Sequence, residues 1–570
     1  MWTTSTSLSW TFVFLFLPVF VDGAALVGPT VKLDSGTFTG ITAGGVSQFL
    51  GIPFAQPPVG DLRLRLPQPN LPYNGTHLAT TFGPACPQQQ TGLPLPPGLA
   101  SETIDLITNL GIDAIFPDSE DCLTINVITP TTATSRSKLP VVLWIYGGGF
   151  ERGTASFPLY DGSVIVERSI LLGMPVVYAS INYRLNGFGF LASQEVKDAG
   201  VGNLGLQDQR QAMRWIQKYI SNFGGDPSKV TIWGESAGAI SVALHLVANN
   251  GNNEGLFRAA FMQSGSAMPT GDITEGQALY DMIVAETGCA GESDTLQCLR
   301  EVDVGVLRAA INKAPGIFDF QSLNLAWPAR ADGVFLTDHP QRLVQQGIIA
   351  DVPFVSGELF VPLQSLTWAY ISVTTKEHLY LAQTLNLNIM SSTDAEFTSY
   401  IQQTLLPSAN LTSAELAQIA SLYPSDPAQG SPFNTGVANA LTPQFKRLAA
   451  FQGDLVFQAP RRFLLGARAG KQDVFAFLSQ RFKTTPTLGS FHVTDLLNVY
   501  GGEELTNYLV RFVTTLNPNG FGNVLWPQYT TQSPQMLTFL DGFIPTTITM
   551  DTFRSAQLAF LNNLTLAHPL

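Results

Sequence analysis

The segment Gly234-Glu235-Ser236-Ala237-Gly238 follows an apolar run at residues 230–233 and precedes a helical pattern at 239–247. It matches the pattern Gly-x-Ser-x-Gly, in which a serine occupies a sharp turn between a strand and a helix. Small residues flank such a serine because bulky side chains would clash within the turn. We therefore predict that Ser236 is a nucleophile, raised above the end of a sheet at the start of a helix.

Other apolar runs recur along the chain, at residues 139–146, 175–181, 259–262, 352–355 and 474–477. Runs without polar alternation are typical of strands buried on both faces, as in a parallel sheet between two layers of helices. Residues 206–222 have helical spacing and would connect two such strands. The sequence therefore predicts one large α/β domain with long insertions, in which a mostly parallel central sheet is flanked by helices. The turn-rich stretch at 31–54 predicts a small N-terminal antiparallel edge.

Three glycines, Gly147, Gly148 and Gly149, end the run at 139–146. Acyl transfer requires hydrogen-bond donors for the oxyanion of the tetrahedral intermediate, and a glycine loop at this place supplies them in α/β-hydrolases. We expect the backbone amides of Gly148, Gly149 and Ala237 to form this oxyanion hole. Tyr146 replaces the histidine that often precedes the glycines, an exchange that leaves the backbone donors in place.

The general base is expected last in the chain order serine, acid, histidine. Of the six histidines, only His492 and His568 follow the run at 474–477. We expect His568, beside the chain end, to be frayed, so His492 is the predicted base. His245, inside the helix after the serine, is interpreted as a buried structural histidine.

Composition excludes several classes of protein. The 570 residues are 45% hydrophobic and 13% charged, and the net charge is −13. An acidic chain lacks the basic surface that nucleic acid binding needs, and its apolar content excludes intrinsic disorder. The sequence leaves the oligomeric state open.

The N-terminus predicts secretion. Residues 10–21 read WTFVFLFLPVFV, an apolar run of signal-peptide length that is too short to span a bilayer. Small residues at Val21 and Gly23 favour cleavage after Gly23, which gives a signal peptide over 1–23 and a mature domain over 24–570. No later segment is long and apolar enough to be a transmembrane helix.

In a secreted protein the cysteines can form disulfides, and three Asn-x-Thr triplets can be glycosylated. Four cysteines allow several pairings, of which the sequential one is the simplest hypothesis. The absence of a Cys-x-x-Cys pair argues against a zinc site, and we expect neither a metal nor a cofactor. The glycosylation acceptors are Asn74, Asn410 and Asn563, each in an Asn-x-Thr triplet.

Several further stretches resemble the type-B carboxylesterase family, which includes secreted fungal lipases and cholinesterases. They cover most of the mature chain and are FLGIPFAQPPVGDLR (49–63), SEDCLTINV (119–127), LWIYGGGFERG (143–153), INYRLNGFGFL (181–191), FGGDPSKVTIWGESAG (223–238), MQSGS (262–266) and LTPQFKR (441–447). The resemblance implies a Ser/Glu/His triad in a single α/β-hydrolase domain. It also implies the disulfides Cys86–Cys122 and Cys289–Cys298, and the structural ion pairs Arg63–Glu120 and Arg184–Asp208.

The chain departs from the family at the triad acid. The family carries this glutamate in an Asp-Glu-Gly segment after the strand that here ends at Gly357, and no such segment follows. Glu358 is the nearest carboxylate and is the predicted acid, with Glu377 the next candidate. Alternatively, residues from about 358 to 380 are not the native sequence, as an intron read through or a shifted frame would produce.

The loop between Cys86 and Cys122 contains a helical pattern at 101–110 with Ile104, Ile107 and Leu110 on one face. In the lipases that the chain resembles, this loop is a flap over the active site. An apolar inner face suits a lipid–water interface. A helix packed permanently on the domain is the alternative.

The sequence thus predicts a secreted carboxylic ester hydrolase of lipase or esterase type that acts through a serine acyl-enzyme. The expected substrate is an ester, either a lipid or an ester at a lipid–water interface. The alternative is a catalytically impaired family member that acts in binding or recognition. Sterol esters, short-chain esters and glycerolipids cannot be told apart from the sequence.

Overall fold

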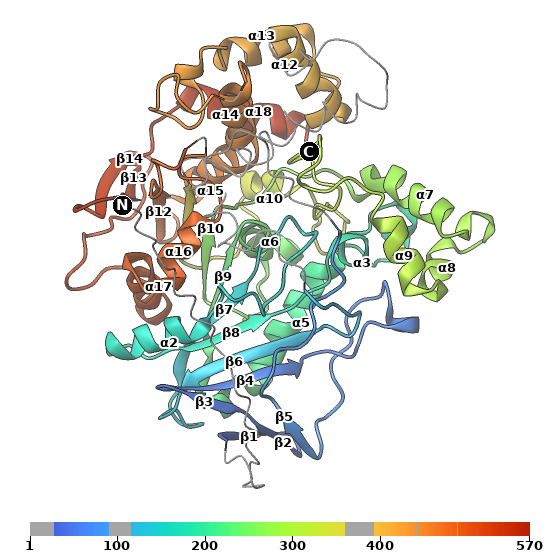
Figure 1. Cartoon of the computed structure of the whole chain (residues 1–570), viewed down its shortest axis with the longest axis vertical. Coiled ribbons are helices and arrows are strands. Elements are labelled where there is room, and N and C mark those ends of the chain that lie inside the picture. The colour runs from blue at the N-terminus through green and yellow to red at the C-terminus, as the bar shows by residue number, and fades with distance from the viewer. Residues whose placement is uncertain (1–27, 91–115, 360–392, 441, 487) are drawn as a thin grey trace, which may run out of the picture.

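An 11-stranded sheet runs through the molecule in the order β14-β13-β12-β11-β10-β9-β7-β8-β6-β4-β3 (Figure 1). The computed structural model describes residues 28–90, 116–359, 393–440, 442–486 and 488–570. The strands are β3 (Ile41–Ala43), β4 (Val46–Pro53), β6 (Thr124–Pro130), β7 (Leu139–Ile145), β8 (Val177–Ile181), β9 (Gly225–Glu235), β10 (Ala259–Gln263), β11 (Phe354–Leu359), β12 (Val474–Ser479), β13 (Gln535–Phe539) and β14 (Thr546–Met550). A second sheet joins β1 (Thr30–Leu33), β2 (Gly36–Thr39) and β5 (Thr76–Leu78).

The centre of the large sheet is parallel. Strands β8, β7, β9, β10, β11, β12 and β13 pair in parallel in that order, whereas β3, β4 and β6 add an antiparallel edge. Each predicted apolar run became one of these parallel strands. The α/β fold class is therefore confirmed, with an N-terminal antiparallel part. Strand β6 was not predicted.

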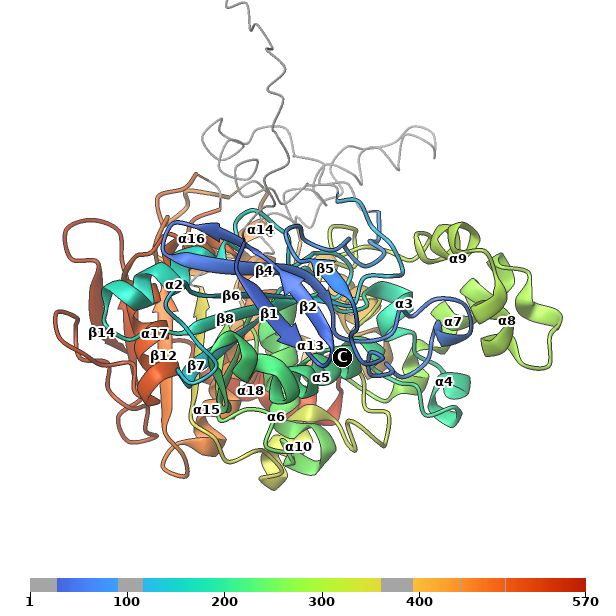
Figure 2. The ribbon, with the colours of Figure 1, turned by 90° about the horizontal axis from the view of Figure 1, so that it is seen from below.

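Helices cover both faces of the sheet (Figure 2). One layer holds α2 (Gly162–Leu171), α16 (Thr494–Tyr500) and α17 (Glu504–Thr515), and the other holds α5 (Leu204–Tyr219), α6 (Ala237–Gly251), α10 (Pro340–Gln346) and α15 (Ala459–Arg468). The predicted crossover is α5, which ends in a short 3₁₀ turn at Ile220–Phe223. The outer helices are α3 (Asn186–Phe190), α4 (Gln194–Asp198), α7 (Gln277–Glu286), α8 (Thr295–Glu301), α9 (Val304–Ile311), α12 (Asp394–Tyr400), α13 (Ser413–Leu422), α14 (Phe445–Gly453) and α18 (Ser555–Ala567).

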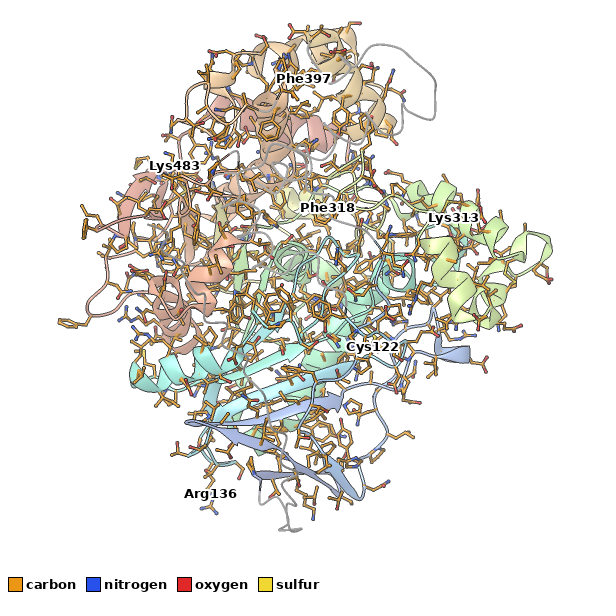
Figure 3. The ribbon with its side chains drawn as sticks, in the orientation of Figure 1. Cys122, Arg136, Lys313, Phe318, Phe397 and Lys483 are labelled. Atoms are coloured by element: carbon orange, nitrogen blue, oxygen red, sulfur yellow. A yellow bond between two sulfur atoms is a disulfide. The ribbon has the colours of Figure 1, made fainter. Side chains whose placement is uncertain are left out.

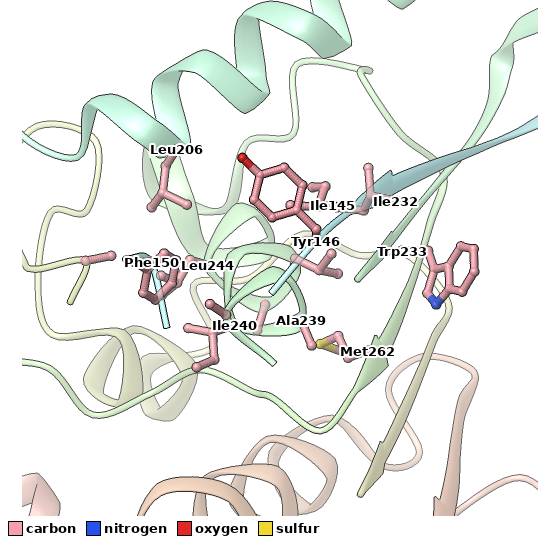
Figure 4. Close-up of a cluster of buried hydrophobic side chains, with 14 of the residues drawn as sticks. Ile145, Tyr146, Phe150, Leu206, Ile232, Trp233, Ala239, Ile240, Leu244 and Met262 are labelled. Atoms are coloured by element: carbon pink, nitrogen blue, oxygen red, sulfur yellow. The ribbon is translucent and has the colours of Figure 1, made fainter. Parts of the chain in front are cut away.

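Part of the core lies where α6 packs on β7, β9 and β10. Ile145, Ile232, Ile240 and Met262 meet there, and all four are buried (Figure 4). Aromatic rings continue this core toward α16, since Trp144 lies 4.3 Å from Trp233 between ring centroids. Trp144 also lies 5.0 Å from Tyr160. Burial of apolar surface stabilises the folded state by about 25 cal/mol per Å². The packing therefore helps to hold in place the strand ends that carry the site.

The implied covalent and ionic links are present in the structure. Cys86 pairs with Cys122, which is labelled in Figure 3, and Cys289 pairs with Cys298. Ion pairs join Arg63 to Glu120 and Arg184 to Asp208; the second pair is buried, with 2.7 Å between Nη2 and Oδ1. None of these four charged residues lines the pocket described below, which agrees with the structural role that the resemblance implies.

One expectation about the chain end is wrong. We expected His568 to be frayed, but the final residues are held by backbone hydrogen bonds. The amide of Leu570 donates to the carbonyl of Pro269, and its carbonyl accepts from Gly271. His568 itself lies 3.5 Å from Glu415 between Nε2 and Oε1. Among the described ranges, no helix combines the length and the apolarity needed to cross a membrane.

Candidate active site

Ser236 occupies the turn between β9 and α6, as the motif predicts. Its backbone is strained, with φ of 56° and ψ of −126°. Strain of this kind is typical of the turn that carries the serine in such motifs. Its amide donates to the carbonyl of Gln263 on β10. A Cβ on Gly238 would lie 2.0 Å from the carbonyl oxygen of Ile145, so only glycine lets α6 start this close to β7. The flanking glycine is therefore required by packing.

The glycine loop after β7 packs directly against the nucleophile. A Cβ on Gly147 would lie 2.7 Å from the Cβ of Ser236. Gly148 has φ of +98°, a conformation that favours glycine, and the turn that it forms is closed by the amides of Glu151 and Arg152 donating to its carbonyl. Ala237 is the first residue of α6, where backbone amides have no partner within the helix. The three predicted oxyanion donors thus come from two segments that meet at Ser236.

One mostly apolar pocket joins these parts. It is lined by Phe116, Gly147, Gly148, Gly149, Arg152, Gly153, Thr154, Phe157, Leu159, Tyr160, Glu235, Ser236, Ile317, Phe318, His492, Val493 and Leu496. Phe318, labelled in Figure 3, comes from the segment between α9 and α10. The structure therefore brings the predicted nucleophile, the predicted base and the glycine loop to a single cavity with aromatic walls.

His492 lies in the loop between β12 and α16 and is buried. Its Nε2 lies 3.1 Å from Oε1 of Glu235, although the angles do not make this a hydrogen bond. Burial lowers the pKa of His492 to about 3, so the imidazole is neutral near pH 7. A neutral imidazole is the form that can accept a proton from a serine hydroxyl.

Two buried carboxyl groups, Glu235 beside His492 and Asp495 near Glu235, were not predicted from the sequence. Glu235 is buried, and this burial together with Asp495 and Glu358 raises its pKa well above the usual range. Asp495 is also buried, which raises its pKa to about 6, and its Oδ2 accepts a hydrogen bond from Gln263. Their positions offered a signal, because one directly precedes the serine and the other follows His492 by three residues.

Glu358 lies in a different setting from the one expected. We expected the strand to end at Gly357, just before Glu358, but β11 extends to Leu359 and Glu358 pairs in register with Leu478 of β12. The side chain is fully buried and is close enough to Glu235 to raise its pKa. Glu377 lies outside the described residues, and Glu358 as triad acid stays a prediction.

The flap prediction falls mostly outside the described residues. Ile104, Ile107 and Leu110 are not described, but both ends of the loop are. Phe116, near its second end, lines the pocket.

His245 is buried as expected, with Nε2 at 2.8 Å from Oε1 of Gln209. The three sequon asparagines, Asn74, Asn410 and Asn563, are exposed.

The strand order, the serine turn and the glycine loop together define an α/β-hydrolase of the ester-cleaving kind. The carboxylesterase family model matches residues 27–557, and the chain belongs to this family. It is 39% identical to Lipase 5 of Diutina rugosa over 91% of this chain and 93% of that protein. It is 38% identical to Secreted lipase 1 of Botryotinia fuckeliana, over 94% and 92% of the two chains. The structure of EstA from Aspergillus niger superposes with a TM-score of 0.76 at 28% identity, over 95% of this chain and 99% of that one. The protein is a carboxylic ester hydrolase.

Proposed function

We propose that this chain is a secreted lipase or esterase that cleaves carboxylic esters through a serine acyl-enzyme. The observation that carries the proposal is the meeting of Ser236, His492 and the loop of Gly148 and Gly149 in one apolar pocket. An apolar pocket suits the acyl chain of an ester, while the polar groups converge on its carbonyl.

In the proposed reaction, the Ser236 hydroxyl attacks the ester carbonyl and His492 accepts its proton. The amides of Gly148, Gly149 and Ala237 stabilise the oxyanion, after which His492 protonates the leaving alcohol. Water then attacks the acyl-enzyme by the same route and releases the acid. Glu358 is the proposed partner of the imidazolium. Each step uses groups of the protein and water, so the proposal includes neither a metal nor a cofactor.

The test is turnover of p-nitrophenyl butyrate by the purified mature protein and by Ser236→Ala. We expect turnover by the parent, and a loss on the order of a millionfold in kcat for the variant, because the nucleophile alone is removed. Retention of a tenth of the parent activity in the variant would rule out Ser236 as the nucleophile. The matched control is Ser228→Ala, which removes an exposed hydroxyl at 2.7 Å from Asp226 and should leave turnover unchanged.

A second candidate function, binding without catalysis, is favoured by one observation, the absence of the family's Asp-Glu-Gly segment. Intact Ser236, His492 and glycine loop argue against it. No turnover of esters of any chain length by the folded parent, with retained binding of a lipid vesicle, would support this alternative.

Secretion and glycosylation belong to the same proposal. A protein made with residues 1–23 should appear in the medium with a new N-terminus at residue 24. Exposed Asn74, Asn410 and Asn563 should carry glycans. Digestion with an N-glycosidase should lower the mass, and Asn74→Gln should remove one glycan.

A further inference from the structure

Glu151 follows the oxyanion glycines by two residues and has no part in the reaction described above. Its side chain is fully buried. Oε2 accepts the backbone amide of Ile317 at 2.8 Å. Oε1 is also buried and has no hydrogen-bond partner among the residues that the structure describes. A buried carboxyl group with one oxygen unpaired is costly, so its presence requires an explanation.

The backbone of Glu151 ties the same loop to the base of the predicted flap. Its carbonyl accepts the amide of Gln89, three residues after Cys86, at 3.0 Å. Gln89 is buried and bonds onward through its side chain, donating to the carbonyl of Ala314 and accepting from the indole of Trp327. The flap base, the oxyanion loop and the segment before Ile317 are thus linked through one residue.

The amide that Glu151 holds belongs to the wall of the pocket. Ile317 and Phe318 both line the cavity that contains Ser236. A Cβ on Gly149 would lie only 3.0 Å from Cδ1 of Ile317, so this wall packs on an oxyanion glycine. Release of the Ile317 amide would therefore free the wall and the Gly149 amide to move together. Small displacements of such donors reduce rates strongly.

The charge of Glu151 bears on the same step. Burial raises the pKa of Glu151 to about 8; the bond from Ile317 and the charge of Arg152 act against this rise, and the charge of Asp319 adds to it. These are the charged groups that act on it from its own loop and from the 316–319 segment. The carboxyl is therefore neutral below about pH 8. An ionised carboxylate there would oppose the negative charge that develops at the oxyanion hole.

We propose that Glu151 is a positioning residue, whose buried carboxyl group fixes the Ile317–Phe318 wall against the oxyanion loop. The inference rests on the proposed function, because it concerns the same pocket and the same acyl transfer. Glu151 itself touches no reacting atom in this scheme.

The experiment measures kcat and KM for p-nitrophenyl butyrate from pH 5.5 to 9.5 in the parent, Glu151→Leu and Glu151→Gln. We expect Glu151→Leu to lower kcat by about 10- to 100-fold with KM changed less than about threefold, since the donors are misplaced only for the transition state. Glu151→Gln keeps an acceptor for the Ile317 amide and cannot ionise. It should recover most of that loss and should lack the fall in kcat that the parent shows above about pH 8.

Asp332→Asn is the matched control. Asp332 is a buried carboxylate that accepts the amides of Val334, Phe335 and Leu336, and it does not line the pocket. This variant should show the pH profile of the parent. Parent kcat in folded Glu151→Leu, or the parent's alkaline fall in Glu151→Gln, would overturn the inference. Thermal unfolding of each variant shows whether it is folded. If Glu151→Leu is not folded, the pH profile of Glu151→Gln alone tests the inference. If Ser236→Ala remains active, the proposed function itself fails, whatever the Glu151 variants do.

Discussion

Nε2 of His492 lies 3.1 Å from Oε1 of Glu235, the residue directly before the predicted nucleophile. Both groups are buried, and burial acts on them in opposite directions. It raises the pKa of the carboxyl and lowers that of the imidazole, so burial opposes the charged form of each group. Neutral partners avoid the cost of an ion pair without solvent.

This pairing leads to a comparison of two buried glutamates. If Glu358 is the triad acid, Glu358→Gln should lower kcat by roughly 10⁴-fold, because the imidazolium loses its stabilising charge. Glu235→Gln keeps the size of the side chain and its capacity for hydrogen bonds, and should lower kcat by less than about tenfold. Steady-state rates on p-nitrophenyl butyrate check both variants. The reverse order of losses would assign the role of triad acid to Glu235.

The departure from the family after Gly357 makes a prediction about the gene. Resemblance to the family resumes near residue 385, which favours an intron read through or a shifted frame between about 358 and 380. If residues 358–380 are not the native sequence, sequencing the transcript across this region should reveal a message that encodes an Asp-Glu-Gly segment in place of Glu358 and its neighbours. A message that encodes residues 358–380 unchanged would contradict this and leave the Glu358→Gln test as decisive.

The buried imidazole should make stability depend on acid. Burial lowers the pKa of His492 from 6.5 to about 3 in the folded protein. As the pH falls below 6.5, the imidazole therefore binds a proton more readily in the unfolded chain, and the folded state loses stability. At pH 4 the free energy of unfolding of the parent should have fallen by roughly 3 kcal/mol relative to that of His492→Gln. At pH 7.5 this effect should be absent. Urea unfolding at both values measures this difference. Exposed His77→Gln is the control and should show no comparable change.

The flap should act at a lipid surface. If Ile104 and Ile107 face the pocket, activity on an emulsified long-chain triacylglycerol should rise sharply once the substrate forms an interface. The double replacement by Ser should reduce that rise by several-fold and largely spare soluble butyrate esters. Equal losses on both substrates would instead indicate a helix packed permanently on the domain.

The buried pair of Arg184 and Asp208 should matter far more to stability than an exposed pair. Their side chains are 3% and 0% exposed, against 54% and 39% for Lys313 and Glu286. Asp208→Asn leaves a buried guanidinium uncompensated and should cost about 3–5 kcal/mol of unfolding free energy. Glu286→Gln should cost less than about 1 kcal/mol. Urea denaturation of the two variants tests this, and similar losses would contradict it.

The sequence predicted the parts of the fold whose cause is local. The parallel strands are apolar over several residues, and the serine turn needs glycines at fixed places. Strand β6 was missed because TINVITP mixes polar and apolar residues, yet all seven are buried. Its Asn126 finds partners only in the folded chain, in the amide of Gly51 and the hydroxyl of Ser180.

The site shows the same division. Ser236 and the glycines are read from a short motif, whereas the settings of Glu235, Asp495 and Glu151 depend on distant segments. Their pKa shifts come from burial by other strands and loops, which spacing along the chain does not encode. Glu358 was expected beyond the strand because the strand could not be followed past Gly357 from its residues alone.

The aromatic rings behind the pocket give the protein an optical reporter of its own. Trp144 and Trp233 are fully buried with centroids 4.3 Å apart, and Tyr160, which packs on Trp144, also lines the cavity. Two indoles this close couple their transitions, and an acyl chain that displaces Tyr160 changes the surroundings of one of them. Intrinsic fluorescence and near-ultraviolet circular dichroism should therefore follow acylation directly, without a chromogenic ester or an attached dye.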